Sequence, residues 1–106
     1  MPKYLWKANY VGEGLKGLLK EGGTSRRAAV EKMVNSMGGK LEVYYYAFGE
    51  TDLYCIADMP DNVSAAAFTL TIAASGAATL NTTVLMTPEE MDQTVKKNPS
   101  YRPPGK

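Results

Sequence analysis

Four aromatic side chains and one carboxylate could form a binding site in this chain. Trp6, Tyr44, Tyr46 and Phe48 offer flat apolar surfaces, and the tyrosine hydroxyls could orient a small apolar or aromatic ligand. Asp52 follows closely in a Gly-Glu-Thr-Asp segment, where burial by a neighbouring subunit would make it a stronger base. Two alternatives stay open, because the aromatic side chains could instead pack a subunit interface and Asp52 could instead hydrogen-bond local backbone in a turn.

A second candidate site combines a hydroxyl with two guanidinium groups. Ser25, Arg26 and Arg27 stand at the expected start of a helix, where they could hold an anion together with the free N–H groups of the first turn. The simpler interpretation is that Thr24 or Ser25 caps the helix and that the arginines are solvated or paired with acids elsewhere. Cys55 lies in the middle of an expected strand, which favours a buried thiol over a nucleophile.

The residues that are missing exclude several classes of chemistry. The chain has 106 residues, no histidine and one cysteine. The absence of histidine excludes Ser-His-Asp and Cys-His triads and histidine-ligated metals, and a single cysteine excludes every Cys-x-x-Cys site. Neither a P-loop nor a Gly-x-Gly-x-x-Gly motif is present. We therefore expect no metal and no cofactor, so that carboxylates and tyrosines are the only candidates for proton transfer.

Charge is segregated along the chain although the net charge is only +1. Residues 1–40 hold eight basic and three acidic side chains, residues 41–95 hold eight acidic and no basic ones, and the last eleven residues hold four basic ones. Because no basic run is longer than two, we do not expect nucleic-acid binding. We expect instead that the acidic and basic parts face each other, within one chain or across a subunit contact.

The segment from Asn62 to Pro88 contains no charged residue over 27 positions, which is long enough to span a membrane. Ten serine, threonine and asparagine residues interrupt it, and such polarity is costly in hydrocarbon. A helix followed by a strand explains the segment better. The first residues lack the apolar region of a signal peptide, so we expect a cytoplasmic protein without a membrane segment.

Hydrophobic periodicity and turn residues predict the elements that position these side chains. Alternation predicts strands over residues 3–10, 41–48, 53–58 and 79–86, with a hairpin between the second and third. Two short helical segments, separated by Gly22-Gly23, are expected between the first two strands. Asp61 and Gly76 are the expected N-cap and C′ residues of a later helix, and Thr87-Pro88-Glu89-Glu90 predicts a capping box for a helix ending near Lys97.

This order of elements predicts an α+β fold of the ferredoxin-like split βαβ type, βαββαβ plus a C-terminal helix, with a four-stranded antiparallel sheet. We expect one domain over residues 1–97 and a proline-rich tail over residues 98–106. In the strand 41–48, alternation places Leu41, Val43 and Tyr45 on one face and Tyr44, Tyr46 and Phe48 on the other. An aromatic sheet face is too apolar to be left bare, so we expect a homodimer or larger homo-oligomer that packs through the sheet.

The chain also resembles the GYD-domain family of small bacterial proteins of uncharacterised function. The resemblance covers residues 2 to about 94 and rests on six segments in order: residues 14–19, 25–32, 38–42, 47–52, 74–76 and 85–91. Gly49 and Asp52 match the Gly-x-Tyr-Asp pattern that gives the family its name, whereas Thr51 occupies the tyrosine position. The resemblance implies a ferredoxin-like fold and an oligomer, and it implies no particular reaction.

Three functions remain open on this basis. The first is a cytoplasmic oligomer that binds a small molecule or has a structural role. The second is a cofactor-free isomerase or oxygenase-like enzyme in which Asp52 or a tyrosine handles protons. The third is a regulatory protein-interaction module. An enclosed pocket above roughly 300 Å³, with Asp52 or a tyrosine hydroxyl pointing into it, would favour ligand binding.

Overall fold

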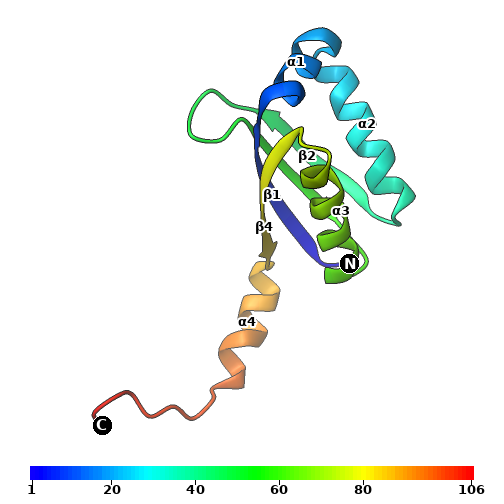
Figure 1. Ribbon diagram of the computed structural model, residues 1–106. Coiled ribbons are helices and arrows are strands. Elements are labelled where there is room, and N and C mark those ends of the chain that lie inside the picture. The colour runs from blue at the N-terminus through cyan, green and yellow to red at the C-terminus, as the bar shows by residue number, and fades with distance from the viewer.

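A computed structural model describes all 106 residues of the chain and contains four strands and four helices (Figure 1). Their bounds are β1 Lys3–Tyr10, α1 Gly12–Glu21, α2 Gly23–Ser36, β2 Lys40–Tyr46, β3 Leu53–Asp58, α3 Asn62–Ala74, β4 Ala78–Leu85 and α4 Pro88–Lys97. All four strands and the predicted helices are present, with ends that differ by one or two residues in most cases. No helix is both long and apolar enough to cross a membrane.

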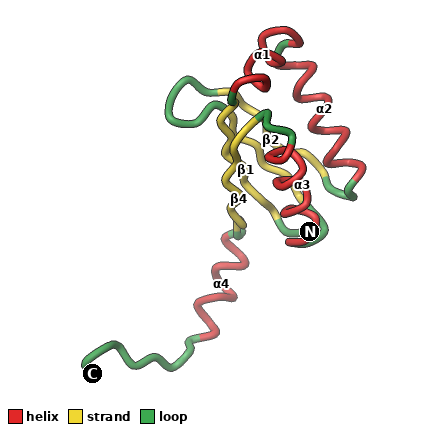
Figure 2. The backbone as a smooth tube through the Cα atoms, in the orientation of Figure 1, coloured by secondary structure: helices red, strands yellow, loops and turns green.

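The strands form one open sheet (Figure 2). Their order is β2-β3-β1-β4, and every neighbouring pair is antiparallel. Helices α2 and α3 cover one face of this sheet, and the other face is open (Figure 1). The fold is therefore a mixed α+β fold with a four-stranded antiparallel sheet, consistent with the predicted ferredoxin-like arrangement.

The core lies between the sheet and these two helices. Alternate residues of β1 point into it, and the side chains of Tyr4, Trp6 and Ala8 are each buried. The Trp6 and Phe68 ring centroids lie 4.8 Å apart, so the Phe68 ring of α3 packs directly on the Trp6 ring of β1. Period-two alternation thus buries one face of β1, as the sequence predicts.

Local signals at the helix ends are confirmed in part. The Asp61 carboxylate accepts from the backbone N–H of Ser64 at 2.8 Å, and Thr87 forms the predicted capping box with Glu90. The prediction that Thr24 or Ser25 caps the second helical segment is wrong. Helix α2 begins at Gly23 instead, because Gly22 at φ +83° provides the left-handed turn that separates it from α1.

A β-bulge in β2 changes which side chains face the helices. The register between β2 and β3 shifts between Leu41 and Val43, so that Leu41 lies opposite Ala57 on the helix-covered side and Val43 lies opposite Ile56 on the open side. The predicted sharing of one face by Leu41, Val43 and Tyr45 is therefore wrong. Uninterrupted alternation does not anticipate the extra residue that the bulge inserts.

The same register places Tyr44 and Tyr46 on the helix-covered face of the sheet, whereas we expected them on the bare face. Tyr44 and Tyr46 lie opposite Cys55 and Leu53 of the core, so they face the helices and not the bare face of the sheet. Phe48 follows the end of β2 in an exposed loop and belongs to neither face. The open face carries a different apolar set: Leu5, Val43, Tyr45, Tyr54 and Ile56.

The segregated charges meet within the chain at one place. Lys3 of β1 forms ion pairs with Glu42 and with Asp58, the latter at 2.9 Å. These contacts join one lysine of the basic first part of the sequence to its acidic middle. The other ion pairs, Lys16 with Glu13 and Arg26 with Glu21, lie within the first part itself.

Helix α4 and the tail extend away from the rest of the molecule (Figure 1). Every residue from Met86 to Lys106 is exposed, and the chain measures 58 × 32 × 23 Å along its principal axes. The domain core therefore ends with β4, and α4 leaves it through a connection of two residues, Met86 and Thr87.

Candidate functional site

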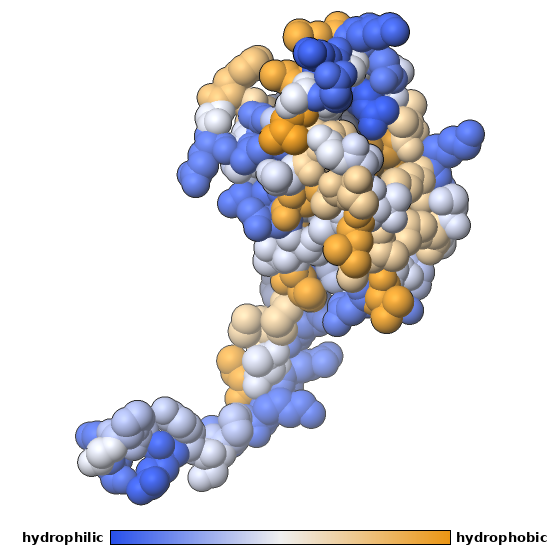
Figure 3. Space-filling view, in the orientation of Figure 1, coloured by the Kyte–Doolittle hydropathy of each residue, from blue (hydrophilic) through white to orange (hydrophobic).

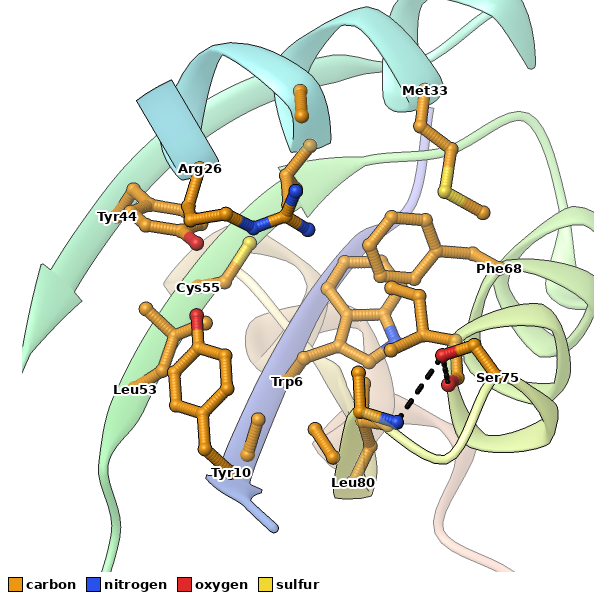
Figure 4. Close-up of a pocket in the computed structure, with 16 residues that line it drawn as sticks. Trp6, Tyr10, Arg26, Met33, Tyr44, Leu53, Cys55, Phe68, Ser75 and Leu80 are labelled. Carbon is orange, nitrogen blue, oxygen red and sulfur yellow. Dashed lines mark hydrogen bonds between the residues drawn. The ribbon is translucent and has the colours of Figure 1, made fainter. Parts of the chain in front are cut away.

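A cavity of about 140 Å³ lies between the sheet and the helices α2 and α3. Fourteen of the sixteen residues that line it are hydrophobic, and they come from all four strands and both helices (Figure 4). This space between the sheet and the two helices is the cavity. Its position follows from the fold, since two helices that cross a twisted sheet leave a gap where their side chains do not fill the space between them.

One end of the cavity is apolar and its polar groups are already paired. Trp6 and Phe68 form its wall, and the indole Nε1 donates to Thr69 Oγ1 at 2.8 Å. Ser75 lies at the rim, where its hydroxyl donates to the Ile72 carbonyl at 2.6 Å (Figure 4). Neither hydrogen bond leaves a group free to bind a ligand here.

The other end gathers polar groups from three elements. Tyr10 ends β1, Tyr44 lies in β2, and Arg26 reaches over from the first turn of α2, with the Cys55 thiol between them (Figure 4). The hydroxyl oxygen of Tyr44 is fully buried and has no hydrogen-bond partner in the protein. A buried hydroxyl without a partner is unfavourable and rare in a folded protein, so this atom is a candidate contact for an acceptor group of a ligand.

The ionisable groups at this end are held in their protonated forms. Burial, together with the nearby hydroxyls of Tyr46 and Tyr10, raises the pKa of Tyr44 far above its usual range. Burial also raises the pKa of Tyr10, although Tyr44 and the charge of Arg26 oppose the rise. Burial alone raises the pKa of the Cys55 thiol to about 12. Near neutral pH the cavity therefore offers hydrogen-bond donors and one positive charge.

The structure separates the three residues of the predicted anion site. Only Arg26 reaches the cavity, and it also lies 3.8 Å from Glu21, measured from Nη1 to Oε1. The Ser25 hydroxyl donates to Glu21 Oε1 at 3.3 Å, and Arg27 is an exposed residue beside Glu31 and β2. The three side chains thus lie against different groups and do not converge on one point.

The predicted aromatic site is divided as well. Trp6 and Tyr44 line the cavity, whereas Tyr46 packs against Tyr44 edge to face at 5.5 Å and donates from its hydroxyl to the Gly23 carbonyl at 3.1 Å. Phe48 is fully exposed and lies outside the site. Tyr46 therefore lies outside the cavity and packs against Tyr44, which forms part of the cavity wall.

Asp52 lies at the end of the sheet, outside the cavity. Its Oδ2 accepts from the backbone N–H of Tyr10 at 3.0 Å, and its own N–H donates to Asn9 Oδ1 and to the Ala8 carbonyl. These contacts fix the end of β1 against the loop that precedes β3. They correspond to the local backbone role that was the alternative for this residue.

Two aromatic residues that line the cavity were not among the predicted site residues. Tyr10 continues the alternation of Tyr4, Trp6 and Ala8 in β1, so the pattern itself contained the signal for it. Phe68 is the one aromatic residue of α3 and therefore a natural wall for the cavity. No three His, Cys, Asp or Glu side chains gather closely enough to hold a metal ion.

Comparison with known proteins gives a family and no function. No curated protein and no solved structure matches the chain. The sequence model of the GYD domain matches residues 4–95, which span all four strands and most of α4. With this match over most of its length, the chain belongs to the GYD domain family.

Proposed function

We propose that this protein binds a small apolar compound that carries a carboxylate, and that the ligand lies in the cavity between the helices and the sheet. The observation that carries the proposal is the buried Tyr44 hydroxyl, which has no partner inside the protein. A ligand oxygen that accepts from this hydroxyl would remove the cost of leaving it unpaired.

The size of the cavity limits the ligand. Its 140 Å³ falls below the roughly 300 Å³ that we expected of a ligand site, so the volume alone does not favour binding and a large metabolite does not fit. It is close to the roughly 150 Å³ of an apolar protein cavity that holds benzene. A single aromatic ring or a short branched chain with one small polar group matches this volume.

The polar end determines which group the ligand carries. Tyr44 and Tyr10 offer hydroxyl protons, Arg26 offers a positive charge, and no aspartate or glutamate lines the cavity. A carboxylate can accept hydrogen bonds from all three side chains, and the arginine offsets part of the cost of burying its charge. An ammonium group could donate to the tyrosine hydroxyl oxygens, but it would face the like charge of Arg26 and no carboxylate, so a cationic ligand is disfavoured.

Binding is favoured over proton-transfer chemistry at this site. The Tyr44 and Tyr10 hydroxyls and the Cys55 thiol stay protonated at neutral pH, and Asp52 is engaged with the backbone of β1 outside the cavity. A cofactor-free isomerase or oxygenase-like enzyme needs a base that can take a proton from its substrate. None of the lining side chains is such a base near neutral pH.

We further propose that copies associate through the open face of the sheet. The apolar side chains Tyr45 and Tyr54, 70% and 38% exposed, lie side by side in the register there. Such a surface favours a second copy as its cover. The unpaired buried Cys55 suits a reducing compartment, so the cytoplasm is the location that we propose.

Titration with benzoate tests the proposed ligand class. We expect saturable binding by calorimetry, and weaker or no binding of benzyl alcohol and of benzylamine, which keep the ring but change the head group. Arg26→Gln should weaken benzoate binding about tenfold or more, as expected for the loss of a charge-assisted hydrogen bond. Arg27→Gln is the matched control and should leave the affinity unchanged, because Arg27 does not line the cavity.

Two results would contradict the proposal. One is that none of the single-ring compounds binds, which would leave the cavity as a packing defect. The other is that Arg26→Gln and Arg27→Gln weaken benzoate binding equally, which would indicate non-specific attraction of the anion to basic side chains. Chemical-shift changes on benzoate addition should centre on Tyr44 and Trp6 and be small on the open sheet face.

A further inference from the structure

Helix α4 is an ordered helix that is not packed on its own domain. Met91 and Val95 lie on one side of it at i, i+4 spacing and are 48% and 67% exposed. Glu89, Gln93 and Lys97 lie on the other sides. A helix of ten residues is marginal in water by itself, and an apolar stripe of this kind is typical of a helix that packs on another surface.

The chain exposes more surface than a compact protein of the same mass. A compact chain of 11.5 kDa is expected to expose about 5,800 Å² and this one exposes 7487 Å², an excess of about 1,700 Å². Its radius of gyration is 17.0 Å against about 13 Å expected for this length. A stable protein interface buries about 800 Å² on each partner, so the excess is sufficient for one.

A groove that suits the apolar side of α4 lies between α3 and β4. It is a shallow depression of about 300 Å³, and Tyr4, Ala66, Leu70 and Val84 form its apolar lining, with Leu70 and Val84 68% and 56% exposed. Helix α3 contains no charged residue, so its outer side offers small and apolar side chains to solvent. Figure 3 shows hydrophobic atoms at the surface over α3 and again along α4.

We propose that the groove between α3 and β4 receives α4 of a second copy of this chain, and that the two copies exchange these helices reciprocally. The lengths agree, because α4 is about 15 Å long and the lining residues of α3, from Asn62 to Leu70, extend over about 12 Å. The apolar stripe and the apolar groove are both on this chain, so two copies satisfy each other without a further component.

The connection to β4 explains why the occupant is the other copy's helix. Only Met86 and Thr87 separate β4 from α4, and Thr87 is held in the capping box while Pro88 fixes the first helical residue. These contacts direct α4 away from its own groove. The groove ends at Val84, two residues before the connection, so a two-fold axis near Met86 places each α4 over the groove of the other copy.

Disulfide trapping between two different single variants tests the exchange directly. Leu70→Cys introduces a thiol in the groove and Val95→Cys introduces one on the α4 stripe. We expect a mixture of the two proteins to form the mixed disulfide dimer under mild oxidation. Tyr45→Cys, on the open sheet face, is the control and should not link to Val95→Cys. The native Cys55 does not interfere, because it is buried and its pKa is raised to about 12.

Three outcomes of trapping would overturn the proposal. A mixture without the mixed dimer would show that α4 does not reach the groove. A double variant that closes within one chain would show that α4 docks on its own domain. Equal linking of Val95→Cys to Tyr45→Cys would place α4 on the open sheet face.

Sedimentation of charge variants gives an independent measurement. We expect Val95→Asp to raise the dissociation constant of the dimer at least tenfold, because it introduces a charge into an apolar contact. Gln93→Asp, on the other side of α4, should leave it unchanged. Both variants should fold, since α4 contributes no buried side chain to its own domain. Because the open sheet face is a second proposed contact, both variants are compared in a Tyr45→Asp background, where a dimer that withstands Val95→Asp would contradict the exchange while leaving the ligand proposal for the cavity intact.

Discussion

Replacing Tyr44 with phenylalanine removes a single oxygen atom from the polar end of the cavity. The ring remains, and with it the edge-to-face contact with Tyr46 at 5.5 Å. The substitution therefore isolates the buried hydroxyl, which has no hydrogen-bond partner in the protein. If this hydroxyl is present for a ligand, the unliganded protein should be more stable without it.

The expected size of the effect follows from two terms. An unpaired buried hydroxyl costs about 1–3 kcal/mol of desolvation free energy, which the variant regains. The lost oxygen also gives up a few van der Waals contacts of about 0.1–0.2 kcal/mol each. We therefore expect the free energy of unfolding to rise by about 1 kcal/mol, which corresponds to a rise in Tm of about 4 °C for a domain of this size.

Urea denaturation and benzoate titration of the same variant provide the assay. The variant should unfold at a higher urea concentration with an unchanged m-value, and it should bind benzoate more weakly than the wild type. Tyr54→Phe is the matched control, because it removes a hydroxyl from the open sheet face and should change neither quantity. A gain in stability together with a loss of affinity is typical of a binding residue.

The opposite pair of results would refute this reasoning. If Tyr44→Phe lowers the free energy of unfolding and leaves benzoate binding unchanged, the hydroxyl is bonded inside the protein. Its neighbours Tyr10 and Tyr46 would then be its partners, and the cavity would lose the feature that supports a ligand.

Three further predictions concern the fold. Gly14→Ala should cost more than about 1 kcal/mol of stability in thermal denaturation, because the added Cβ would meet the Ala77 carbonyl oxygen at 1.9 Å. Gly17→Ala on the same helix is the control and should be neutral or stabilising, because its Cβ would meet nothing within 4 Å. Between about pH 9 and pH 12 the unfolded chain loses the Cys55 thiol proton while the folded chain keeps it, so stability should fall by up to about 1.4 kcal/mol per pH unit; Cys55→Ala should lack this component of the urea-measured pH profile. Thr87→Ala should remove the capping box and speed amide exchange in α4. At concentrations too low for the dimer the midpoint of global unfolding should stay unchanged, and a lower midpoint there would show that α4 stabilises its own domain.

Periodicity and capping signals were enough to predict the order of elements. The alternation in β1 and the capping box at Thr87 are local features, and local features survive in the fold because nothing in the tertiary structure opposes them. The helix start at Gly23 was missed because a glycine with positive φ at Gly22 replaces a side-chain cap there. Both glycines can be read as the end of one helix or as the start of the next.

The face of the sheet that holds the tyrosines could not be predicted in the same way. A strand with apolar residues on both sides, as in residues 41–48, has no pattern that distinguishes the core side from the open side. The bulge after Leu41 then shifts the register by one residue. Glu42, at this bulge, pairs with Lys3, which is a contact between distant parts of the chain that no local pattern reveals.

Helix α3 connects the two proposals, because its two apolar sides belong to different sites. Phe68 and Ile72 face the cavity, whereas Ala66 and Leu70 face the groove. A helix without charged residues gains stability from cover on both sides, so a contact that orders α3 on one side reduces the cost of binding on the other. By linkage, the exchanged α4 should tighten benzoate binding by the same factor by which benzoate tightens the dimer. Equal benzoate affinity in the wild type and in Val95→Asp would show that α3 is already rigid and that the two sites are independent.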